Sequence, residues 1–131
     1  MEKLIILTNQ KEEIIDIGEK VEDFISKLNY NKKARLCNLF LIHTTAALAT
    51  ADLDPGTDLD ILDALRAMIP KLKYRHPHNP EHVGDHILST IIGQSLLLPL
   101  DNGKLVLGTW QKVVLLEFDG PRKREIYVTL I

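Results

Sequence analysis

The amino-acid sequence predicts an α+β fold, a mainly antiparallel β-sandwich with about three helices, in a single domain over residues 1–131. Two observations favour this fold class. About six strand-like and three helix-like segments follow one another without the regular strand–helix–strand alternation of a parallel sheet. The length of 131 residues allows one hydrophobic core but is too short for a large barrel or doubly wound enzyme.

The first half of the chain contains two strand patterns and one helix pattern. Residues 4–8 form a short apolar run, and residues 34–45 are largely apolar on both alternating faces, which predicts a buried central strand. Residues 18–28 carry apolar side chains at helical spacing, and Asn29-Tyr30-Asn31 is expected to end this helix.

Turn residues divide the second half. After a turn at Asp54-Pro55-Gly56, Thr57 or Asp58 is expected to cap a helix that Pro70 ends. A further helix over residues 80–92 is expected to stop at Gly93. The last third predicts a strand meander with a hairpin turn at 101–103, and its strands are residues 95–100, 105–109, 112–118 and 124–131.

The composition indicates a soluble, cytoplasmic protein. The net charge of -2 argues against nucleic-acid binding through a broad basic field, yet it allows a local anion site. No apolar run reaches the roughly 18 residues of a membrane helix, and the N-terminus lacks the apolar core of a signal peptide. The one cysteine, Cys37, cannot form an internal disulfide and is expected to be a small core residue.

Polar residues at the end of the predicted central strand are the first functional candidates. His43-Thr44-Thr45 offers an imidazole and two hydroxyls, which can hold a phosphate, a substrate hydroxyl or a metal. A strand-edge cap with exposed threonines is the alternative interpretation.

A histidine group, His76, His78, His82 and His86, falls within eleven residues. His82 and His86 are four positions apart on a predicted helix, a spacing that can chelate a metal. His43, His76 and His86 supply three nitrogens for a catalytic zinc if the strand end meets this helix. His78 and His82 are expected to be solvent-exposed.

Acidic residues follow the His-Thr-Thr segment. Some of them are candidate ligands for Mg²⁺ beside a pyrophosphate, and Asp52 is the best candidate because it is nearest to His43 in sequence. Asp58, Asp60 and Asp63 are better explained as favourable charges near a helix N-terminus.

Two segments of the meander are candidate binding elements. Trp110 can stack on a heteroaromatic ring and Gln111 can donate and accept hydrogen bonds, while a core tryptophan at a β-bulge is the alternative. Arg122 and Arg124 follow a Gly-Pro turn and can bind phosphate, while a solvated turn or an ion pair with Asp119 is the alternative.

These segments, taken in order, resemble the YjbQ-like family, whose members are often described as secondary thiamine-phosphate synthases. The resemblance covers nearly the whole chain. The matching segments are His43-Thr44-Thr45-Ala46-Ala47-Leu48, Tyr74-Arg75-His76, His86-Ile87, Gly93-Gln94-Ser95, Leu107-Gly108-Thr109-Trp110-Gln111 and Glu117-Phe118-Asp119-Gly120-Pro121-Arg122. Members often carry Asn-Glu where this chain has Ala51-Asp52.

The resemblance implies a homotrimer that joins hydroxymethylpyrimidine diphosphate to a thiazole phosphate and releases pyrophosphate. Among the positions that match the family are His43, His76 and His86, which we assign to catalysis together with Asp52. Substrate binding is assigned to Thr44, Thr45, Trp110, Gln111, Arg122 and Arg124. A small phosphorylated metabolite is the expected partner, with no nucleic acid and no membrane.

Two alternatives remain open beside this transferase. The first is a metal-dependent phosphate-ester hydrolase with a divalent metal, Zn or Mg, on His43, His76 and His86. The second is a non-catalytic module that binds a small anion.

Overall fold

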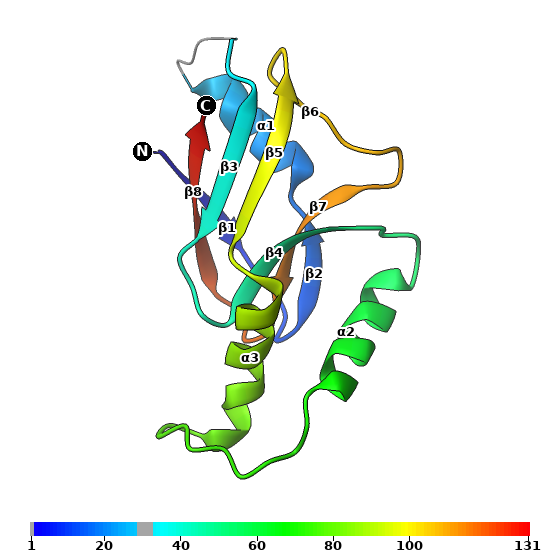
Figure 1. The fold of residues 1–131 in the computed structure, drawn as a ribbon, viewed down its shortest axis with the longest axis vertical. Coiled ribbons are helices and arrows are strands. Elements are labelled where there is room, and N and C mark those ends of the chain that lie inside the picture. The colour runs from blue at the N-terminus through cyan, green and yellow to red at the C-terminus, as the bar shows by residue number, and fades with distance from the viewer. Residues whose placement is uncertain (1, 29–32) are drawn as a thin grey trace.

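Two antiparallel sheets pack against each other in the computed structural model, which describes residues 2–28 and 33–131 (Figure 1). The larger sheet has the order β1-β8-β3-β5-β6, with β1 (Glu2–Leu7), β8 (Lys123–Leu130), β3 (Leu36–Leu41), β5 (Ser95–Asp101) and β6 (Lys104–Leu105). The smaller sheet has the order β2-β7-β4, with β2 (Glu13–Asp16), β7 (Lys112–Glu117) and β4 (Ala46–Ala51). The predicted α+β sandwich is confirmed.

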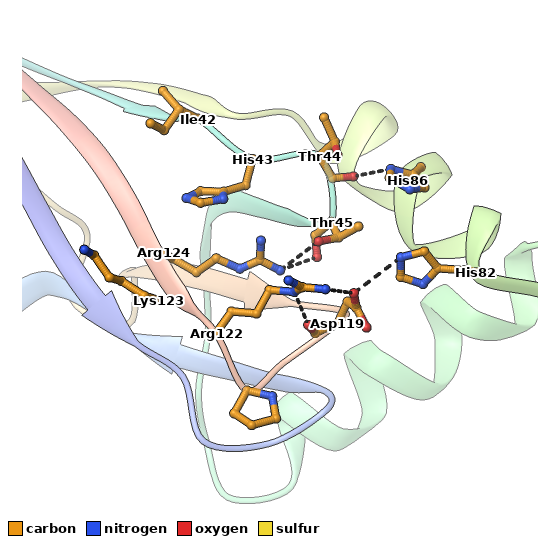
Figure 2. Close-up of a pocket in the computed structure, with 11 residues that line it drawn as sticks. Ile42, His43, Thr44, Thr45, His82, His86, Asp119, Arg122, Lys123 and Arg124 are labelled. Carbon is orange, nitrogen blue, oxygen red and sulfur yellow. Dashed lines mark hydrogen bonds and ion pairs between the residues drawn. The ribbon is translucent and has the colours of Figure 1, made fainter. Parts of the chain in front are cut away.

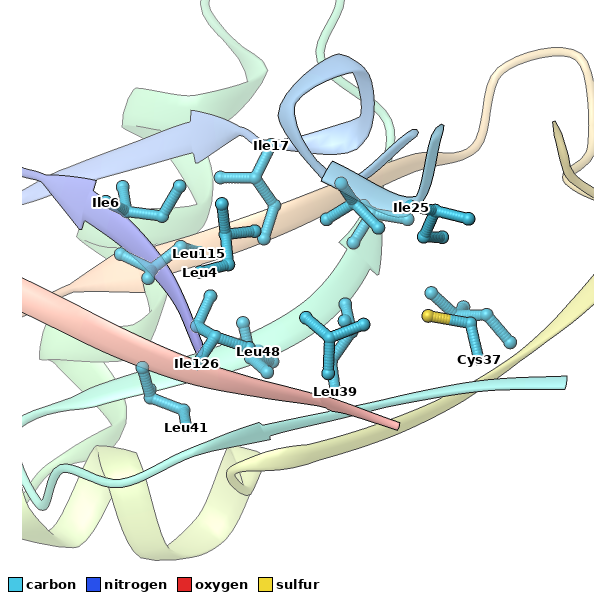
Figure 3. Packing of buried hydrophobic residues seen from close by; sticks show 14 of the residues in the cluster. Leu4, Ile6, Ile17, Ile25, Cys37, Leu39, Leu41, Leu48, Leu115 and Ile126 are labelled. Carbon is cyan, nitrogen blue, oxygen red and sulfur yellow. The ribbon is translucent and has the colours of Figure 1, made fainter. Parts of the chain in front are cut away.

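One hydrophobic cluster fills the space between the sheets (Figure 3). In β3, Cys37, Leu39 and Leu41 are buried, in step with the two-residue period of a strand. Cys37 is a core residue, as predicted, and burial raises the pKa of its thiol to about 11. The apolar face of α1 (Gly18–Lys27) packs into the same cluster, which confirms the first predicted helix.

A second cluster lies on the outer face of the smaller sheet, where α2 (Thr57–Met68) and α3 (Val83–Ile92) cover it. β7 contributes to both clusters: Val113 and Leu115 point into the first, and Val114 and Leu116 into the second. The sequence of this strand therefore lacks alternation because both of its faces are buried.

The predicted strand over residues 34–45 is shorter in the structure, and a separate strand follows it. β3 ends at Leu41 and β4 begins at Ala46, so His43 lies in a loop between strands of different sheets. The alanines of β4 have low strand propensity, which hid this strand in the sequence. Their small side chains let α3 approach closely, and Ser89 Oγ donates to the carbonyl of Ala46 at 2.6 Å.

Other element boundaries also differ from the expectation. β2 was not predicted, the strand expected at 105–109 is limited to β6, and a 3-10 turn, η1 (Pro80–His82), precedes α3. Gly56, with φ 91°, begins α2 in place of the expected side-chain cap. The hairpin turn is confirmed by positive φ at Asn102 and Gly103. The expected helix end at 29–31 lies outside the described residues.

Among the described residues, no helix is long and apolar enough to cross a membrane.

Candidate functional site

A pocket of about 650 Å³, here named the His43 pocket, opens where the β3–β4 loop, α3 and the β7–β8 turn meet (Figure 2). Its lining residues are Ile42, His43, Thr44, Thr45, His82, His86, Asp119, Pro121, Arg122, Lys123 and Arg124. The loop, the helix and the turn are far apart in sequence, so the fold brings together predicted site residues that no local pattern connects.

Arg124 is buried beneath this pocket, with 1% of its surface exposed. Its Nε donates to the two carboxylate oxygens of Glu117 at 2.9 and 3.1 Å. Its Nη2 donates to the carbonyl and the hydroxyl of Thr45 at 3.1 and 2.9 Å, and also contacts Glu117. Figure 2 shows the remaining nitrogen of the guanidinium turned toward the space beside His43.

Glu117, the partner of Arg124, is completely buried. It also accepts a hydrogen bond from the Thr8 hydroxyl at 2.7 Å and from the Asp119 backbone amide at 3.2 Å. Burial acts to raise the pKa of Glu117, but the hydrogen bonds from Arg124 and Thr8 outweigh it and lower this pKa. The carboxylate is therefore ionised at neutral pH and holds Arg124 in one position.

Asp119 fixes a second arginine of the pocket. Arg122 donates from Nη2 to the Asp119 carboxylate at 2.7 Å and from Nε to the Asp119 carbonyl at 2.8 Å. Lys11 contacts the same carboxylate at 2.6 Å. Burial acts to raise the pKa of Asp119, but hydrogen bonds from Lys11 and Arg122 lower it to about 2. Arg122 therefore forms the ion pair with Asp119 that the sequence allowed as an alternative. It also lines the pocket.

His82, which lines the pocket, contacts two carboxylates. Its Nδ1 lies 2.7 Å from buried Asp85, and its Nε2 lies 3.3 Å from Asp119. Arg66 Nη2 also contacts Asp85, at 2.8 Å. The expectation that His82 is solvent-exposed is wrong, because these contacts leave its side chain 22% exposed. His78 is exposed, as expected.

His43 is held by its Nε2, which accepts a hydrogen bond from the backbone N–H of Glu125 at 2.8 Å. Partial burial, followed by the nearby Arg124 cation, lowers the pKa of His43. The neutral ring therefore carries its proton on Nδ1, and this N–H is the donor that remains for a ligand.

His86 has the opposite arrangement. Its Nδ1 lies 3.0 Å from the carbonyl oxygen of Thr44, which can only accept, so Nδ1 donates. In the neutral ring Nε2 then carries a lone pair. The rings of His76 and His86 stack with centroids 5.0 Å apart, although His76 is not part of the pocket wall.

A cluster of possible metal ligands lies beside the pocket in the part of the chain that the structure describes. Ligand atoms of His82, Asp85 and Asp119 are within 4.8 Å of one another. The cations Lys11, Arg66 and Arg122 already contact these carboxylates. The cluster therefore fits an ion-pair network better than a divalent cation.

The predicted metal ligands are His43, His76 and His86. Within residues 2–28 and 33–131, their ring nitrogens do not form a group in which all lie within 4.8 Å of one another. His43 uses Nε2 to accept from Glu125, so that nitrogen is not free. His86, with its lone pair on Nε2 and its Nδ1 bonded to a carbonyl, has the orientation common among metal-bound histidines. His86 is thus the predicted ligand whose ring nitrogen is oriented for a metal, and the His76 ring stacks on it.

The remaining predicted residues lie elsewhere. Asp52, Trp110 and Gln111 line a separate depression of about 380 Å³, here named the Trp110 pocket, at the other end of β4. The Gln111 side chain accepts from the Gly108 amide and donates to Thr50, so it satisfies local groups. Trp110 is 71% exposed, so it is not the core tryptophan that the sequence allowed.

Sequence reasoning missed four polar residues that support the pocket: the buried Thr8, Asp85 and Glu117, and the exposed Lys11. A signal for two of them exists: Glu117 ends an apolar strand and Asp85 lies on the apolar face of a helix. A charged residue at a buried position needs a partner, and such positions indicate an internal ion pair. Several of the partners come from distant segments, namely Lys11 and Arg66 for Asp85 and Thr8 for Glu117, and no sequence pattern connects them.

Comparison with known proteins matches residues 2–131 to the family described as "UPF0047 protein YjbQ-like". A UPF0047 protein of Archaeoglobus fulgidus is 35% identical over 127 residues, which cover 96% of this chain and 97% of the relative. YugU of Bacillus subtilis is 32% identical over 132 residues, covering 100% of this chain and 98% of the relative.

Solved structures agree with these sequence matches. The conserved hypothetical protein TT1486 of Thermus thermophilus superimposes with a TM-score of 0.86 at 35% identity, and each chain is covered over 100% of its length. A YjbQ/UPF0047 protein of Clostridium acetobutylicum gives a TM-score of 0.85 at 32% identity, again with 100% of each chain covered. With the fold and nearly the full length matched, this chain belongs to the YjbQ-like UPF0047 family.

Proposed function

We propose that the His43 pocket binds the phosphate or diphosphate group of a small metabolite. One observation carries this proposal: Arg124 is a buried cation, fixed by Glu117 and Thr45, that still lines the pocket. A side chain that is already immobilised loses little freedom when it binds. Its remaining N–H donor also acts strongly because the site is partly shielded from water.

The other pocket residues add donors around the same space. Arg122 is oriented by Asp119, and Lys123 lies between the two arginines in sequence. His43 adds an N–H on Nδ1, as the acceptor role of its Nε2 requires. Three cations and an imidazole N–H suit an anion with several oxygens, such as a diphosphate.

The reaction that we propose for this site is formation of thiamine phosphate, as the family resemblance implies. The thiazole nitrogen attacks the methylene carbon of hydroxymethylpyrimidine diphosphate, and a C–N bond forms. The C–O bond to the diphosphate breaks, and its electron pair leaves with pyrophosphate. Arg122, Lys123 and Arg124 stabilise the charge that develops on this leaving group.

Calorimetric titration with pyrophosphate tests the binding step. We expect Arg122→Gln to weaken binding about tenfold or more, since it removes a charge-assisted hydrogen bond. Lys104→Gln is the matched control, because Lys104 is an exposed cation that contacts Glu22 on α1, away from the His43 pocket. Equal affinities for wild type, Arg122→Gln and Lys104→Gln would contradict the proposal.

A thiamine-phosphate assay with both substrates tests the chemical step. We expect product in the wild type and a loss of activity in Arg122→Gln that exceeds the loss in Lys104→Gln. Pyrophosphate binding without any product would keep the binding function and refute the transferase.

Metal-dependent hydrolysis of a phosphate ester is a second candidate, favoured by the free Nε2 of His86 beside His76. A bound divalent metal would supply a hydroxide for attack on phosphorus. Metal analysis of protein purified without a His tag tests it, with His86→Gln as the variant that should lose the metal. Hydrolysis that survives chelation would rule this candidate out.

The homotrimer implied by the resemblance is also a proposal for this chain. The exposed Trp110 is a surface that a neighbouring copy would cover. Light scattering gives the mass directly, and a monomeric mass at working concentration would contradict it.

A further inference from the structure

A further cavity, here named the Arg66 cavity, lies between α2 and α3 at the end where residues 69–79 connect these helices. Its volume is about 740 Å³, within the range of cavities that hold small organic molecules. Much of its wall is apolar, and these residues are Ile69, Pro70, Leu72, Tyr74 and Pro80. It is separate from the His43 pocket, with which it shares no lining residue.

The charge of this cavity is positive although the chain is acidic overall. Arg66, Lys71 and Lys73 line it, against one acid, Glu81. In the described residues, neither Lys71 nor Lys73 has an ion-pair partner. An apolar wall with two lysine ammonium groups at its edge suits a molecule that has an apolar body and a negative charge.

Gly84 opens the inner side of the Arg66 cavity. It is buried in the first turn of α3, and a Cβ at this position would lie 3.6 Å from Arg66 Nη1. The other terminal nitrogen of Arg66, Nη2, is taken by Glu12 and Asp85. The missing side chain of Gly84 therefore leaves Nη1 of Arg66 accessible from the cavity.

The same arginine connects the cavity to the His43 pocket. Arg66 contacts Asp85 at 2.8 Å, and Asp85 contacts His82 Nδ1 at 2.7 Å. His82 lines the His43 pocket. A ligand that draws Arg66 toward the cavity therefore changes the contacts of Asp85 and of His82.

We propose that the Arg66 cavity binds a small organic anion with an apolar body, and that this ligand alters the His43 pocket through Arg66, Asp85 and His82. The inference does not depend on what the His43 pocket binds. It assigns a second, regulatory site to the chain.

Fluorescence titration with 8-anilinonaphthalene-1-sulfonate, an apolar anion, tests the site. We expect saturable binding that is about tenfold tighter than that of the uncharged N-phenyl-1-naphthylamine. Lys73→Glu should weaken binding of the sulfonate about fivefold or more, whereas Lys104→Glu, with a matched charge change at an exposed distant site, should not. Arg122→Gln should also leave it unchanged, which separates this cavity from the His43 pocket.

Gly84→Ala is a variant that should stay folded, because its Cβ makes only ordinary contacts and alanine favours a helix by about 1 kcal/mol. We expect weaker sulfonate binding in a protein of equal or higher melting temperature. Equal binding of the charged and neutral probes, or no effect of Lys73→Glu and Gly84→Ala, would overturn the proposal.

The link to the His43 pocket is measured at the His82 ring by NMR, with His82→Gln to assign its signal. The sulfonate should shift this signal in the wild type but not in Arg66→Gln. Fluorescence titration checks that the Arg66→Gln variant still binds the sulfonate. An unmoved His82 signal at saturation refutes the link. If instead Lys73→Glu changes the mass of the protein in light scattering, the cavity is an interface between copies and the proposal fails.

Discussion

The backbone N–H of Glu125 donates to Nε2 of His43 across 2.8 Å, so a residue of β8 sets the tautomer of a histidine in the β3–β4 loop. This single contact makes the imidazole a donor toward the His43 pocket through Nδ1. It favours an anion over a metal as the group that meets His43 there.

We expect His43 to make the protein less stable in mild acid. Partial burial and Arg124 lower its pKa, so between the folded pKa and the unfolded value near 6.5 the unfolded state binds more protons. The stability that neutral His43 contributes is fully present above about pH 6.5 and is lost as the pH falls through the folded pKa. Urea unfolding of wild type and His43→Gln from pH 8 to pH 5 should show their difference in unfolding free energy shrink in acid. A constant difference would contradict this.

Breaking the buried pair of Arg124 and Glu117 should cost far more than removing both partners together. Both residues are at most 1% exposed, so Glu117→Leu leaves an uncompensated buried cation. We expect Glu117→Leu or Arg124→Met to lower the unfolding free energy by about 3–5 kcal/mol. The double variant should lose less than the sum, measured in a double-mutant cycle, and simple additivity would show that the pair is not coupled.

Gly120 should tolerate no side chain. A Cβ there would lie 2.1 Å from the backbone oxygen of Gln10 and 2.9 Å from Glu117 Cγ. We expect Gly120→Ala to cost about 3 kcal/mol or more and to weaken pyrophosphate binding, because it displaces Glu117. Gly108→Ala is the matched control, since its nearest contacts would be 3.6 Å or more. Chemical denaturation measures the unfolding free energy of both variants. An equal loss of unfolding free energy in the two would contradict the expectation.

Asp119 should stabilise the fold down to strongly acidic pH. Burial opposes the effect, but hydrogen bonds from Lys11 and Arg122 hold its pKa at about 2, below the ordinary 3.8. The stabilisation is present above the unfolded pKa and is lost as the pH falls through about 2. Asp119→Asn should therefore cost about 2 kcal/mol at neutral pH and almost nothing near pH 2. Acid titration of unfolding followed by circular dichroism measures this difference.

The fold was largely predictable because patterns of burial are local. The three helices, the hairpin turn at Asn102-Gly103 and the strand at residues 112–118 follow from spacing and turn residues. β4 was not predictable in this way, because alanine has a low strand propensity. Its small side chains instead allow α3 to pack closely on this strand.

The site was predictable only in part, because sequence shows residue types but not distances. His43, Thr44, Thr45, His86, Arg122 and Arg124 do share one pocket. Trp110 and Asp52 do not join them, although nothing in the spacing of these residues separates the two groups. The contact of His82 with Asp119 was hidden as well, because Asp119 lies on the β7–β8 turn, whereas Asp85 is three residues from His82 and its contact fits helical spacing.

β7 supplies side chains to both hydrophobic clusters, and this links the folding of the two. If the cluster between the sheets separates from β7, Leu115 becomes exposed. If the cluster beneath α2 and α3 separates from β7, Leu116 becomes exposed. Because these neighbours share one backbone, a loosening on either side is transmitted to the other. The helices that carry His86 and Arg66 are thus bound to the same cooperative unit as the β-sandwich, even though they pack outside it.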